Sequence, residues 1–514
     1  MTFSQSAHWN RRDFLKLAPL VFAGSLTHSL AAGIERLGAD SNIILIVMDA
    51  LSAKHMSLYG YRRDTTPNIN RFADRAHVYV NHYSAGNFTT PGTASLLTGL
   101  YPWTHRAFNQ GGLIKRDLTL SNYFSLLGDR YYRFAFSQNP YPDRILAQFI
   151  DDLDRFLPLT SYSLRGNKLF SDKVGKDRYL ASAAFEEFLF PLSADVTGSS
   201  LFGYIYKSFA VDTFLKNQKH TGYPKGTPTV EGYTPYLNED IYAGVYREIQ
   251  RLEGQPRPFF SYFHLFSPHF PYKPGRRYYE LFENDGVTSL AKPKFPFGFK
   301  MSDEEVDSKR LLYDQQIAHV DAEFGRLIEL LEQDGILENS TLILTSDHGE
   351  IFERGFYGHG GPIMYEPVIS IPLLIHTPGQ TEGSVVHTPS CNIDVLPTIL
   401  HIAGQTWSNA VDGQVLPGFG GEQDDNRAIF SMYAGENSVF RPIGKASIAM
   451  RKGKYKLIAY LGYYEGRIVY EFYDLQEDPE EIRDLVSGNP VELKLMKAEL
   501  LEKLAAADRP YNPD

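Results

Sequence analysis

The run Asn42–Met48 constrains the fold more than any other feature of this sequence. It is apolar without interruption from Ile43 onward and is followed directly by Asp49. A strand with one face in water alternates apolar and polar residues, whereas a strand covered on both faces is apolar throughout. The run therefore predicts a strand at the centre of an α/β sheet, with a carboxylate at its carboxyl end.

Other segments extend this pattern into a sheet with helices on its faces. Further strands are predicted at His77–Val80, Pro258–Phe266, Thr341–Thr345 and Ile371–Ile375. N-cap signals and amphipathic spacing predict a helix that begins at Thr66-Pro67 and others over Thr89–Leu97 and Asp314–Leu331. Strands that alternate with helices indicate a mostly parallel sheet, in which ligands bind at the carboxyl ends of the strands.

The chain divides into a large part, a less regular segment and a small part. Residues 40–425 hold the predicted sheet and form the expected catalytic domain. Within it, residues 150–240 are rich in aromatic residues and lack periodicity, so we expect an insertion there. Residues 426–514 contain short predicted strands at Ala446–Met450, Tyr455–Tyr460 and Ile468–Tyr473, then a helix from about Val491 to Ala506. This pattern predicts a smaller C-terminal α+β subdomain.

The N-terminus resembles an export signal. Asn10–Lys16 contains paired arginines followed by Phe-Leu-Lys, and a moderately apolar run continues from Leu17 to about Ala32. Residues 1–31 therefore predict a twin-arginine signal peptide, the export machinery as a partner, and a periplasmic or extracellular location. An uncleaved anchor or a chance basic N-terminus are the alternatives, although the apolar run is short for a membrane span.

Composition excludes some classes of function. The formal net charge of −10 argues against a nucleic-acid partner, because phosphate backbones need a basic face. An acidic protein that acts on an anionic group needs a local positive site, and a metal ion is the simplest one. Cys391 is the only cysteine, which rules out an intrachain disulfide and a zinc–thiolate site. Any metal ligands must then be carboxylates, imidazoles, amides or hydroxyls.

The candidate ligands follow predicted strands. Asp49 follows the first strand, and Asp347-His348 follow the strand that begins at Thr341. Two carboxylates and an imidazole favour one divalent ion, with zinc or manganese preferred and calcium as an alternative. Thr89 begins a predicted helix, where unpaired backbone N–H groups attract anions. The alternative is that Thr89 only caps that helix.

Four histidines are candidates for anion binding or proton transfer. His269 follows a buried strand, and His359 lies in a glycine-rich loop that lets a side chain approach a ligand. For His264, which lies in the middle of a predicted strand, and His376, at a strand end, we expect core or structural roles.

Together these segments resemble the sulfatase family of the alkaline-phosphatase-like superfamily. The motifs that carry the resemblance are Asn42–Asp49, Leu58–Tyr61, Thr66–Ala73, Thr89–Pro102, Ser267–Pro271, Thr345–Glu350, Asp394–Thr398, Phe472–Leu475 and Asp478-Pro479. They run from Asn42 to near the C-terminus and leave out residues 150–240. The resemblance implies an alkaline-phosphatase-like α/β fold.

The departures from the family pattern are informative. Thr89 stands where the family has the cysteine or serine that becomes formylglycine. Gly92 and Thr93 occupy the serine and arginine positions of the family signature, and Ala50 replaces a second aspartate. The sulfate-contacting Lys-x-His of the family has no counterpart, since Ser137–Asn139 occupies that stretch. These differences argue against the formylglycine mechanism.

Threonine nucleophiles occur in phosphoryl-transfer members of the superfamily. The resemblance to them implies a metal set of Asp49, Thr89, Asp347 and His348, and catalytic roles for Thr89, His269 and His359. Members with two metal ions need an additional Asp-x-x-x-His, which we do not find. Asp314 and His319 lie in an amphipathic helix, where we expect them to be structural.

The predicted function is that of a metal-dependent hydrolase or transferase that acts on phosphate esters through Thr89, outside the cytoplasm. A phosphodiesterase or phosphoryl transferase is favoured, and the substrate could be linked to a glycan or a lipid. The alternatives are a sulfatase that acts without formylglycine, a catalytically inactive sulfatase-like binding protein, and a phosphomonoesterase. The sequence leaves the substrate, the acceptor and the oligomeric state open.

Overall fold

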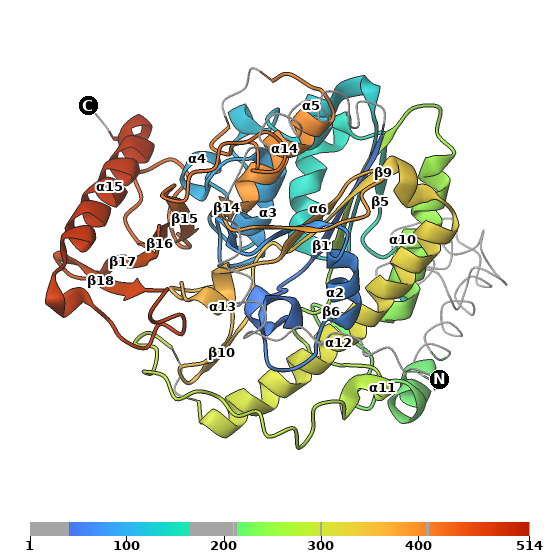
Figure 1. Ribbon diagram of the computed structural model, residues 1–514, viewed down its shortest axis with the longest axis horizontal. Helices are drawn as coiled ribbons and strands as arrows, with labels where there is room; N and C mark the ends of the chain where they lie inside the picture. The colour runs from blue at the N-terminus through green and yellow to red at the C-terminus, as the bar shows by residue number, and fades with distance from the viewer. Residues whose placement is uncertain (1–40, 165–208, 210–212, 299–300, 408–410, 513–514) are drawn as a thin grey trace, which may run out of the picture.

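The computed structural model describes residues 41–164, 209, 213–298, 301–407 and 411–512. Within these residues, eight strands form one central sheet (Figure 1). In spatial order they are β13 (Ser384–Val386), β2 (His77–Tyr79), β12 (Leu373–His376), β9 (Ser340–Thr345), β1 (Asn42–Met48), β8 (Phe259–Leu265), β4 (Tyr132–Ser137) and β5 (Arg155–Leu157). The predicted strands are confirmed, with ends shifted slightly.

The predicted mostly parallel arrangement is also confirmed. Strands β9, β1, β8, β4 and β5 run parallel to one another. Strand β12 runs antiparallel to both β9 and β2, although its apolar sequence resembles that of the parallel strands. An apolar run predicts burial on both faces, and it contains no information about strand direction.

Strand β1 shows why the sheet needs two helical layers. Its odd-numbered residues from Ile43 to Val47 pack in one apolar cluster, and its even-numbered residues from Ile44 to Met48 pack in another. All of them have no exposed surface. Because successive side chains of a strand point to opposite faces, a fully apolar strand must be covered on both sides.

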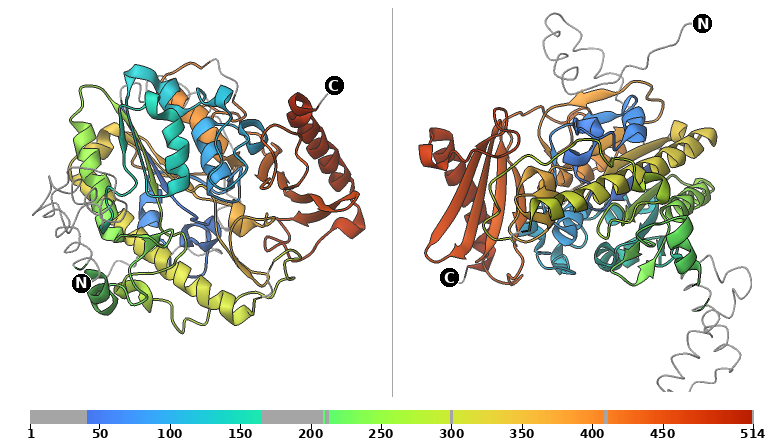
Figure 2. Two further views of the ribbon diagram at one scale, coloured as in Figure 1. Left: turned by 180° about the vertical axis from the view of Figure 1, so that it is seen from behind. Right: turned by 90° about the horizontal axis from the view of Figure 1, so that it is seen from below.

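Helices cover the two faces of the sheet (Figures 1 and 2). One face packs against α3 (Thr89–Thr98), α5 (Tyr123–Leu127), α6 (Pro140–Leu146) and α14 (Val395–Ile402). The other packs against α2 (Pro67–Ala73), α10 (Asn238–Glu253) and α12 (Asp303–Gln333).

Helix α12 begins earlier than the predicted start at Asp314. It begins at Asp303, after a capping box in which the Ser302 side chain accepts a hydrogen bond from the Glu305 backbone and the Glu305 side chain accepts one from Ser302. Its first turns are rich in charged residues, so hydrophobic spacing alone places its start too late.

Shorter elements connect these layers. The remaining short helices and strand pairs are α4 (Pro102–His105), α11 (Arg276–Tyr279), α13 (Glu366–Ile369), β3 (His82–Tyr83) with β14 (Ser390–Cys391), β6 (Thr229–Val230) with β7 (Thr234–Pro235), and β10 (Ile351–Glu353) with β11 (Phe356–Gly358). The 3₁₀ helices are η1 (Ala53–His55), η2 (Ser57–Tyr59), η3 (Arg116–Leu118), η4 (Gly128–Arg130), η5 (Ala147–Asp152), η7 (Ile336–Asn339), η8 (Asn392–Asp394), η9 (Val486–Gly488) and η10 (Arg509–Tyr511).

The C-terminal residues form a separate antiparallel sheet beside the main part, drawn in red in Figure 2. Its strands and helix are β15 (Ile429–Tyr433), β16 (Ala446–Lys452), β17 (Tyr455–Tyr464), β18 (Arg467–Asp474) and α15 (Val491–Asp508). Helix α15 packs on the sheet through Leu493, Met496 and Leu500. The backbone of Met432 donates a hydrogen bond of 2.8 Å to the Ala85 carbonyl, which joins this sheet to the segment before α3.

Two predicted segments lie wholly or partly outside the described residues. They are the signal peptide at 1–31 and much of the insertion at 150–240, of which 165–208 and 210–212 are not described. Strand β5 lies within that insertion in sequence, yet it is part of the central sheet. In the part of the chain that is described, no helix combines the length and the apolar character needed to cross a bilayer.

Gly92 lets α3 approach the loop after β9. A Cβ atom on Gly92 would lie 2.2 Å from the carbonyl oxygen of Asp347, which is a fixed backbone atom. Replacing glycine by alanine inside a helix normally stabilises by about 0.5–1 kcal/mol. Overpacking against backbone costs about 1–3 kcal/mol or more, so the steric cost exceeds the gain in helix stability.

We therefore expect Gly92→Ala to lower the free energy of unfolding by about 1–2 kcal/mol or more, as measured by urea denaturation. Gly488→Ala is the matched control, because an added Cβ there meets nothing within 4 Å. Equal stability of the Gly92→Ala protein and the native protein would show that α3 does not need this close approach.

Candidate functional site

Two buried aspartates meet at the carboxyl edge of the central sheet. Strands β1 and β9 are parallel neighbours in which Val47 is paired with Thr345. Asp49 and Asp347 each lie two residues beyond that pair, so both carboxylates leave the sheet at the same edge. Both are completely buried. Ligands of α/β proteins bind at this edge.

His348 and Thr89 complete the cluster. The His348 Nε2 atom lies 3.5 Å from Asp49 Oδ1 and 3.7 Å from Asp347 Oδ2. It lies 3.3 Å from the Thr89 Oγ1 atom. One ligand atom from each of Asp49, Asp347 and His348 lies within 4.8 Å of the other two. The four side chains of the predicted metal set therefore lie together.

The hydrogen bonds of His348 fit a metal ligand. Its Nδ1 atom lies 2.9 Å from the Gly349 carbonyl oxygen, which can only accept, so Nδ1 holds a proton. In the neutral imidazole, Nε2 then directs a lone pair toward the carboxylates. Among the described residues, Asp49 Oδ1 and Asp347 Oδ2 are buried without a hydrogen-bond partner. Buried charges of this kind need a compensating cation, so these residues fit a divalent metal ion.

The pKa values show the same demand for positive charge. Burial and the negative charge of Asp49 raise the pKa of Asp347. Burial also opposes ionisation of Asp49, but the neighbouring histidines, His269 first, outweigh it and hold the pKa of Asp49 well below its usual range. Burial disfavours the charged form of His348, yet the two carboxylates raise its pKa to about 9.

His264 also contacts the carboxylates, contrary to the expectation of a purely core role. Its Nε2 atom lies 3.2 Å from Asp49 Oδ2 and 3.7 Å from Asp347 Oδ2. Its Nδ1 atom lies 2.9 Å from the hydroxyl of Tyr262, which can donate to Nδ1 while Nε2–H donates to Asp49. Asn139 adds a second donor to Asp49 Oδ2, at 2.5 Å. These contacts fix one oxygen of Asp49 and leave the other facing His348.

The sequence held an indirect signal for His264. It is paired with Val47 in the register of β1 and β8, near the carboxyl end of the sheet. A histidine at the end of the strand beside Asp49 becomes a site candidate once that pairing is known. Asn139 lies in the Ser137–Asn139 stretch, which the sequence identified only as lacking the family's Lys-x-His.

The two predicted catalytic histidines lie beside the cluster. The His359 ring centroid lies 4.3 Å from that of His348 and 4.9 Å from that of His269. His269 Nδ1 lies 2.7 Å from the Phe270 carbonyl oxygen, and His359 Nδ1 lies 2.9 Å from Glu350 Oε1. Each histidine thus donates through Nδ1, which leaves its Nε2 atom for a ligand.

Glu350 is a site residue to which the sequence assigned no role. It is completely buried, and its partner His359 is about one-fifth exposed. Burial opposes ionisation, but the charge of His359 and its hydrogen bond hold the pKa of Glu350 below its usual range. Burial lowers the pKa of His359. Glu350 therefore fixes the orientation and the tautomer of His359.

Thr89 lies in the first turn of α3. The N-cap position belongs to Phe88, so the alternative that Thr89 only caps the helix is wrong. The Thr89 hydroxyl instead faces His348, and the residue is only 4% exposed. The N-terminal N–H groups and the helix dipole add positive potential at this point.

A second group of possible ligands in the described part of the chain fits a metal ion less well. It comprises Glu239, His319 and Glu323. The Gly275 backbone N–H donates to His319 Nδ1 at 3.1 Å, which makes Nδ1 an acceptor. The proton of the neutral imidazole is then on Nε2, the atom that faces the carboxylates, where a ligand would need a lone pair.

Two other residues have the structural roles expected of them. The Nδ1 atom of His376 lies 2.8 Å from the Arg75 carbonyl oxygen. Asp314 accepts hydrogen bonds from Tyr61 at 2.6 Å and from Arg63 at 2.7 Å.

Comparison with known proteins identifies related families. The sequence profile of the family described as Sulfatase matches residues 41–153 and 195–405. A second profile, described as N-sulphoglucosamine sulphohydrolase, C-terminal, matches residues 353–509. The two matches extend from β1 to α15.

Individual relatives are distant but match along most of their length. An arylsulfatase of Clostridium perfringens is 23% identical over 502 residues, which cover 91% of this chain and 95% of that protein. The multifunctional alkaline phosphatase superfamily protein PehA of Trinickia caryophylli is 24% identical over 524 residues, covering 91% and 96%. In fold, the chain is similar to a phosphonate monoester hydrolase of Agrobacterium radiobacter, with a TM-score of 0.64 at 20% identity over 91% of this chain and 95% of that chain.

We expect His264→Leu to weaken divalent-metal binding by about 10–100-fold, because outer partners of metal ligands contribute on this scale. His264→Gln, which can restore an N–H donor to Asp49, should recover part of the affinity. The measurement is competition with a chelator, with circular dichroism to confirm folding.

His376→Leu is the matched control, since this buried histidine hydrogen-bonds to the Arg75 carbonyl and packs beside the Phe72 ring rather than beside the carboxylates. Native affinity in the His264→Leu protein, or an equal loss in the His376→Leu protein, would contradict a specific role of His264.

Proposed function

Because this chain belongs to the sulfatase family, we propose that it is a metal-dependent phosphodiesterase or phosphoryl transferase that acts outside the cytoplasm with Thr89 as its nucleophile. The observation that carries the proposal is the position of the Thr89 hydroxyl. It lies 3.3 Å from His348 Nε2, beside two buried carboxylates that each have one oxygen without a hydrogen-bond partner among the described residues. A hydroxyl held at a metal centre and at a helix N-terminus suits attack on an anionic ester.

The residues that would hold the metal ion are Asp49, Thr89, Asp347 and His348. A divalent ion bound there lowers the pKa of the threonine hydroxyl and offsets negative charge on the transferred group. The donor set of carboxylates and imidazole favours zinc or manganese, and calcium is the alternative.

The protein side chains have separate tasks in the proposed reaction. Thr89 Oγ1, after releasing its proton to solvent, forms a bond to phosphorus while the bond from phosphorus to the leaving alcohol oxygen breaks. The product is a threonine phosphoester that keeps the other alcohol group of the diester. His269 and His359 bind non-bridging oxygens through Nε2 or, when protonated there, give a proton to the leaving alcohol. Water or an acceptor alcohol then attacks phosphorus and releases Thr89. Glu350 keeps His359 in the orientation that this task requires.

The charges around Thr89 favour an ester with a single negative charge. Two carboxylates balance one divalent ion, and the carboxylate of Glu350 is hydrogen-bonded to His359, so little net positive charge remains beyond the α3 terminus. Phosphate diesters and sulfate monoesters each have one negative charge near neutral pH, whereas phosphate monoesters approach two. This balance supports a diester over a monoester of phosphate.

A sulfatase without formylglycine is the second candidate. It is favoured by the match to the profile described as N-sulphoglucosamine sulphohydrolase, C-terminal, and by the arylsulfatase relative. Thr89 favours phosphate instead, because its secondary hydroxyl cannot become the aldehyde of formylglycine by the route used for cysteine and serine. A protein of similar fold is a phosphonate monoester hydrolase, which is consistent with a phosphorus-containing substrate for this chain.

Removing the Thr89 hydroxyl tests the nucleophile. We expect Thr89→Ala to reduce kcat by about 10³-fold or more while the protein keeps most of its metal, since three ligands remain. Thr89→Ser retains a hydroxyl and should keep measurable turnover. Near-native activity of the Thr89→Ala protein would rule out a covalent threonine intermediate.

Substrate class is tested by parallel assays with aryl phosphate, bis-aryl phosphate and aryl sulfate. We expect the highest kcat/KM for the diester and, after acid quenching, a phosphoryl adduct on the peptide that contains Thr89, detected by mass spectrometry. A preference for aryl sulfate without an adduct on Thr89 would favour the sulfatase alternative. Absence of both turnover and bound metal would favour the inactive binding protein.

A further inference from the structure

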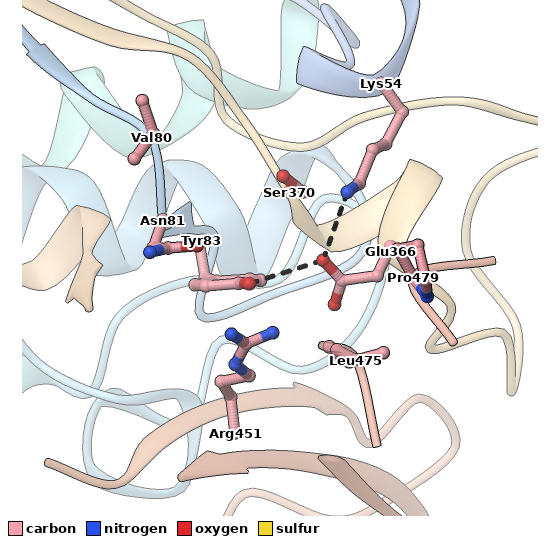
Figure 3. A pocket seen from close by; sticks show the side chains of 9 residues that line it. All are labelled: Lys54, Val80, Asn81, Tyr83, Glu366, Ser370, Arg451, Leu475 and Pro479. Atoms are coloured by element: carbon pink, nitrogen blue, oxygen red, sulfur yellow. Dashed lines mark hydrogen bonds and ion pairs between the residues drawn. The ribbon is translucent and has the colours of Figure 1, made fainter. Parts of the chain in front are cut away.

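A small polar cavity lies where the C-terminal sheet meets the main part of the chain (Figure 3). Its volume is about 110 Å³. Lys54 of η1, Glu366 and Ser370 of the α13 segment, Tyr83 of β3 and Arg451 of β16 line it. None of the side chains assigned above to the metal ion or to catalysis lines this space, which we call the Lys54–Arg451 cavity.

Arg451 brings a positive charge to this cavity without a direct ion pair. Its Nε atom is buried without a hydrogen-bond partner among the described residues. The guanidinium carbon lies 5.7 Å from the centroid of the Tyr83 ring, and no described carboxylate forms an ion pair with it. Arg451 is partly buried, and Glu366 and Glu481 attract its charge from beyond ion-pair distance. A partly desolvated guanidinium without a directly bound anion favours one, and its planar fork suits bidentate contact with an oxyanion.

The nearby carboxylates are already paired with lysines. Glu366 Oε2 lies 3.8 Å from the Lys54 ammonium, and Oε1 lies 3.1 Å from the ammonium of the fully buried Lys456. Lys456 also lies 2.7 Å from Glu481. The described groups at and beside the cavity are therefore three cations, Lys54, Arg451 and Lys456, against two carboxylates. One positive charge remains for a bound anion.

The size of the cavity limits the ligand. Pockets for drug-sized molecules span about 300–1,000 Å³, well above this volume. A water molecule takes about 30 Å³ of liquid, so the space is large enough for a tetrahedral oxyanion of five heavy atoms.

We propose that the Lys54–Arg451 cavity binds a small tetrahedral oxyanion, inorganic phosphate or sulfate, between the Arg451 guanidinium and the Lys54 ammonium. Figure 3 shows these two side chains extending toward the cavity from opposite sides, with Ser370 near Lys54. The Ser370 hydroxyl can add a donor. The proposal concerns a site separate from Thr89, and it holds whether or not Thr89 is the nucleophile.

An anion in this cavity would join three segments that support the candidate active site. Lys54 follows Asp49 by five residues, and Arg451 belongs to the C-terminal sheet. The Val368 carbonyl of α13 accepts a 2.7 Å hydrogen bond from the backbone of Gly349, next to His348. Because the anion binds the folded arrangement of these segments and not the unfolded chain, it should also stabilise the protein.

The test is equilibrium dialysis of the full-length, metal-loaded protein with radiolabelled phosphate and, separately, sulfate. A His269→Ala/His359→Ala background weakens oxyanion binding at the candidate active site, so that the cavity can be measured by itself. In this background we expect about one bound anion per chain. Adding Arg451→Met should weaken that binding at least tenfold, and adding Lys54→Met, at a half-exposed position, provides a second variant should Arg451→Met fail to fold.

Lys452→Met is the matched control. It removes the same charge from the same strand, but its side chain is paired with Glu499, and adjacent residues of a strand face opposite sides. The proposal is supported if either anion loses its binding in the Arg451→Met protein and keeps it in the Lys452→Met protein. The anion that binds with the lower Kd is then the ligand. Binding of neither anion, or equal loss in both variants, overturns it.

Discussion

Two carboxylates buried side by side are the constraint on which the rest of this site depends. Asp49 and Asp347 have no exposed surface, and one oxygen of each lacks a partner among the described side chains. Burying a single unpaired charge costs several kcal/mol, and two like charges at close range cost more. The donors His264 and Asn139 offset part of this cost at Asp49. The remaining oxygens of Asp49 and Asp347, together with Nε2 of His348, suit a divalent cation. A fold that keeps this pair must also keep the cation or the protons that replace it.

The position of Thr89 follows from backbone packing rather than from its own side chain. Helix α3 reaches the carboxylates because Gly92 leaves room for the Asp347 carbonyl oxygen, to which Ser84 Oγ also donates a 2.5 Å hydrogen bond. The same approach brings the positive end of α3 and the Thr89 hydroxyl to the metal ligands. Helix packing, anion attraction and the placement of the proposed nucleophile thus depend on one geometric arrangement. Steric fit at Gly92 therefore affects chemistry as well as stability.

The sequence predicts those features that depend on local patterns, and it misses those that depend on pairing in space. Continuous apolar runs predict β1, β8 and β9, and the residues that follow β1 and β9 then identify Asp49, Asp347 and His348. The direction of β12 is not predictable in this way, because burial on both faces gives the same pattern in either direction. His264 and Glu350 acquire their roles only through partners, Asp49 across the β1–β8 register and His359 across a loop. Such partners become visible only when strand order and loop geometry are known.

The C-terminal sheet contributes to the candidate site although it supplies none of the proposed ligands. Lys456 of β17 has no exposed surface and lies between Glu366 of α13 and Glu481, at 3.1 and 2.7 Å. The same α13 segment accepts the hydrogen bond of Gly349 that holds the chain after Asp347-His348. A lysine buried at this depth is tolerated only with close anionic partners, so the sheet and α13 must keep their relative positions. The geometry of the proposed metal ligands is therefore coupled to the C-terminal sheet, although that sheet is separate from the central one.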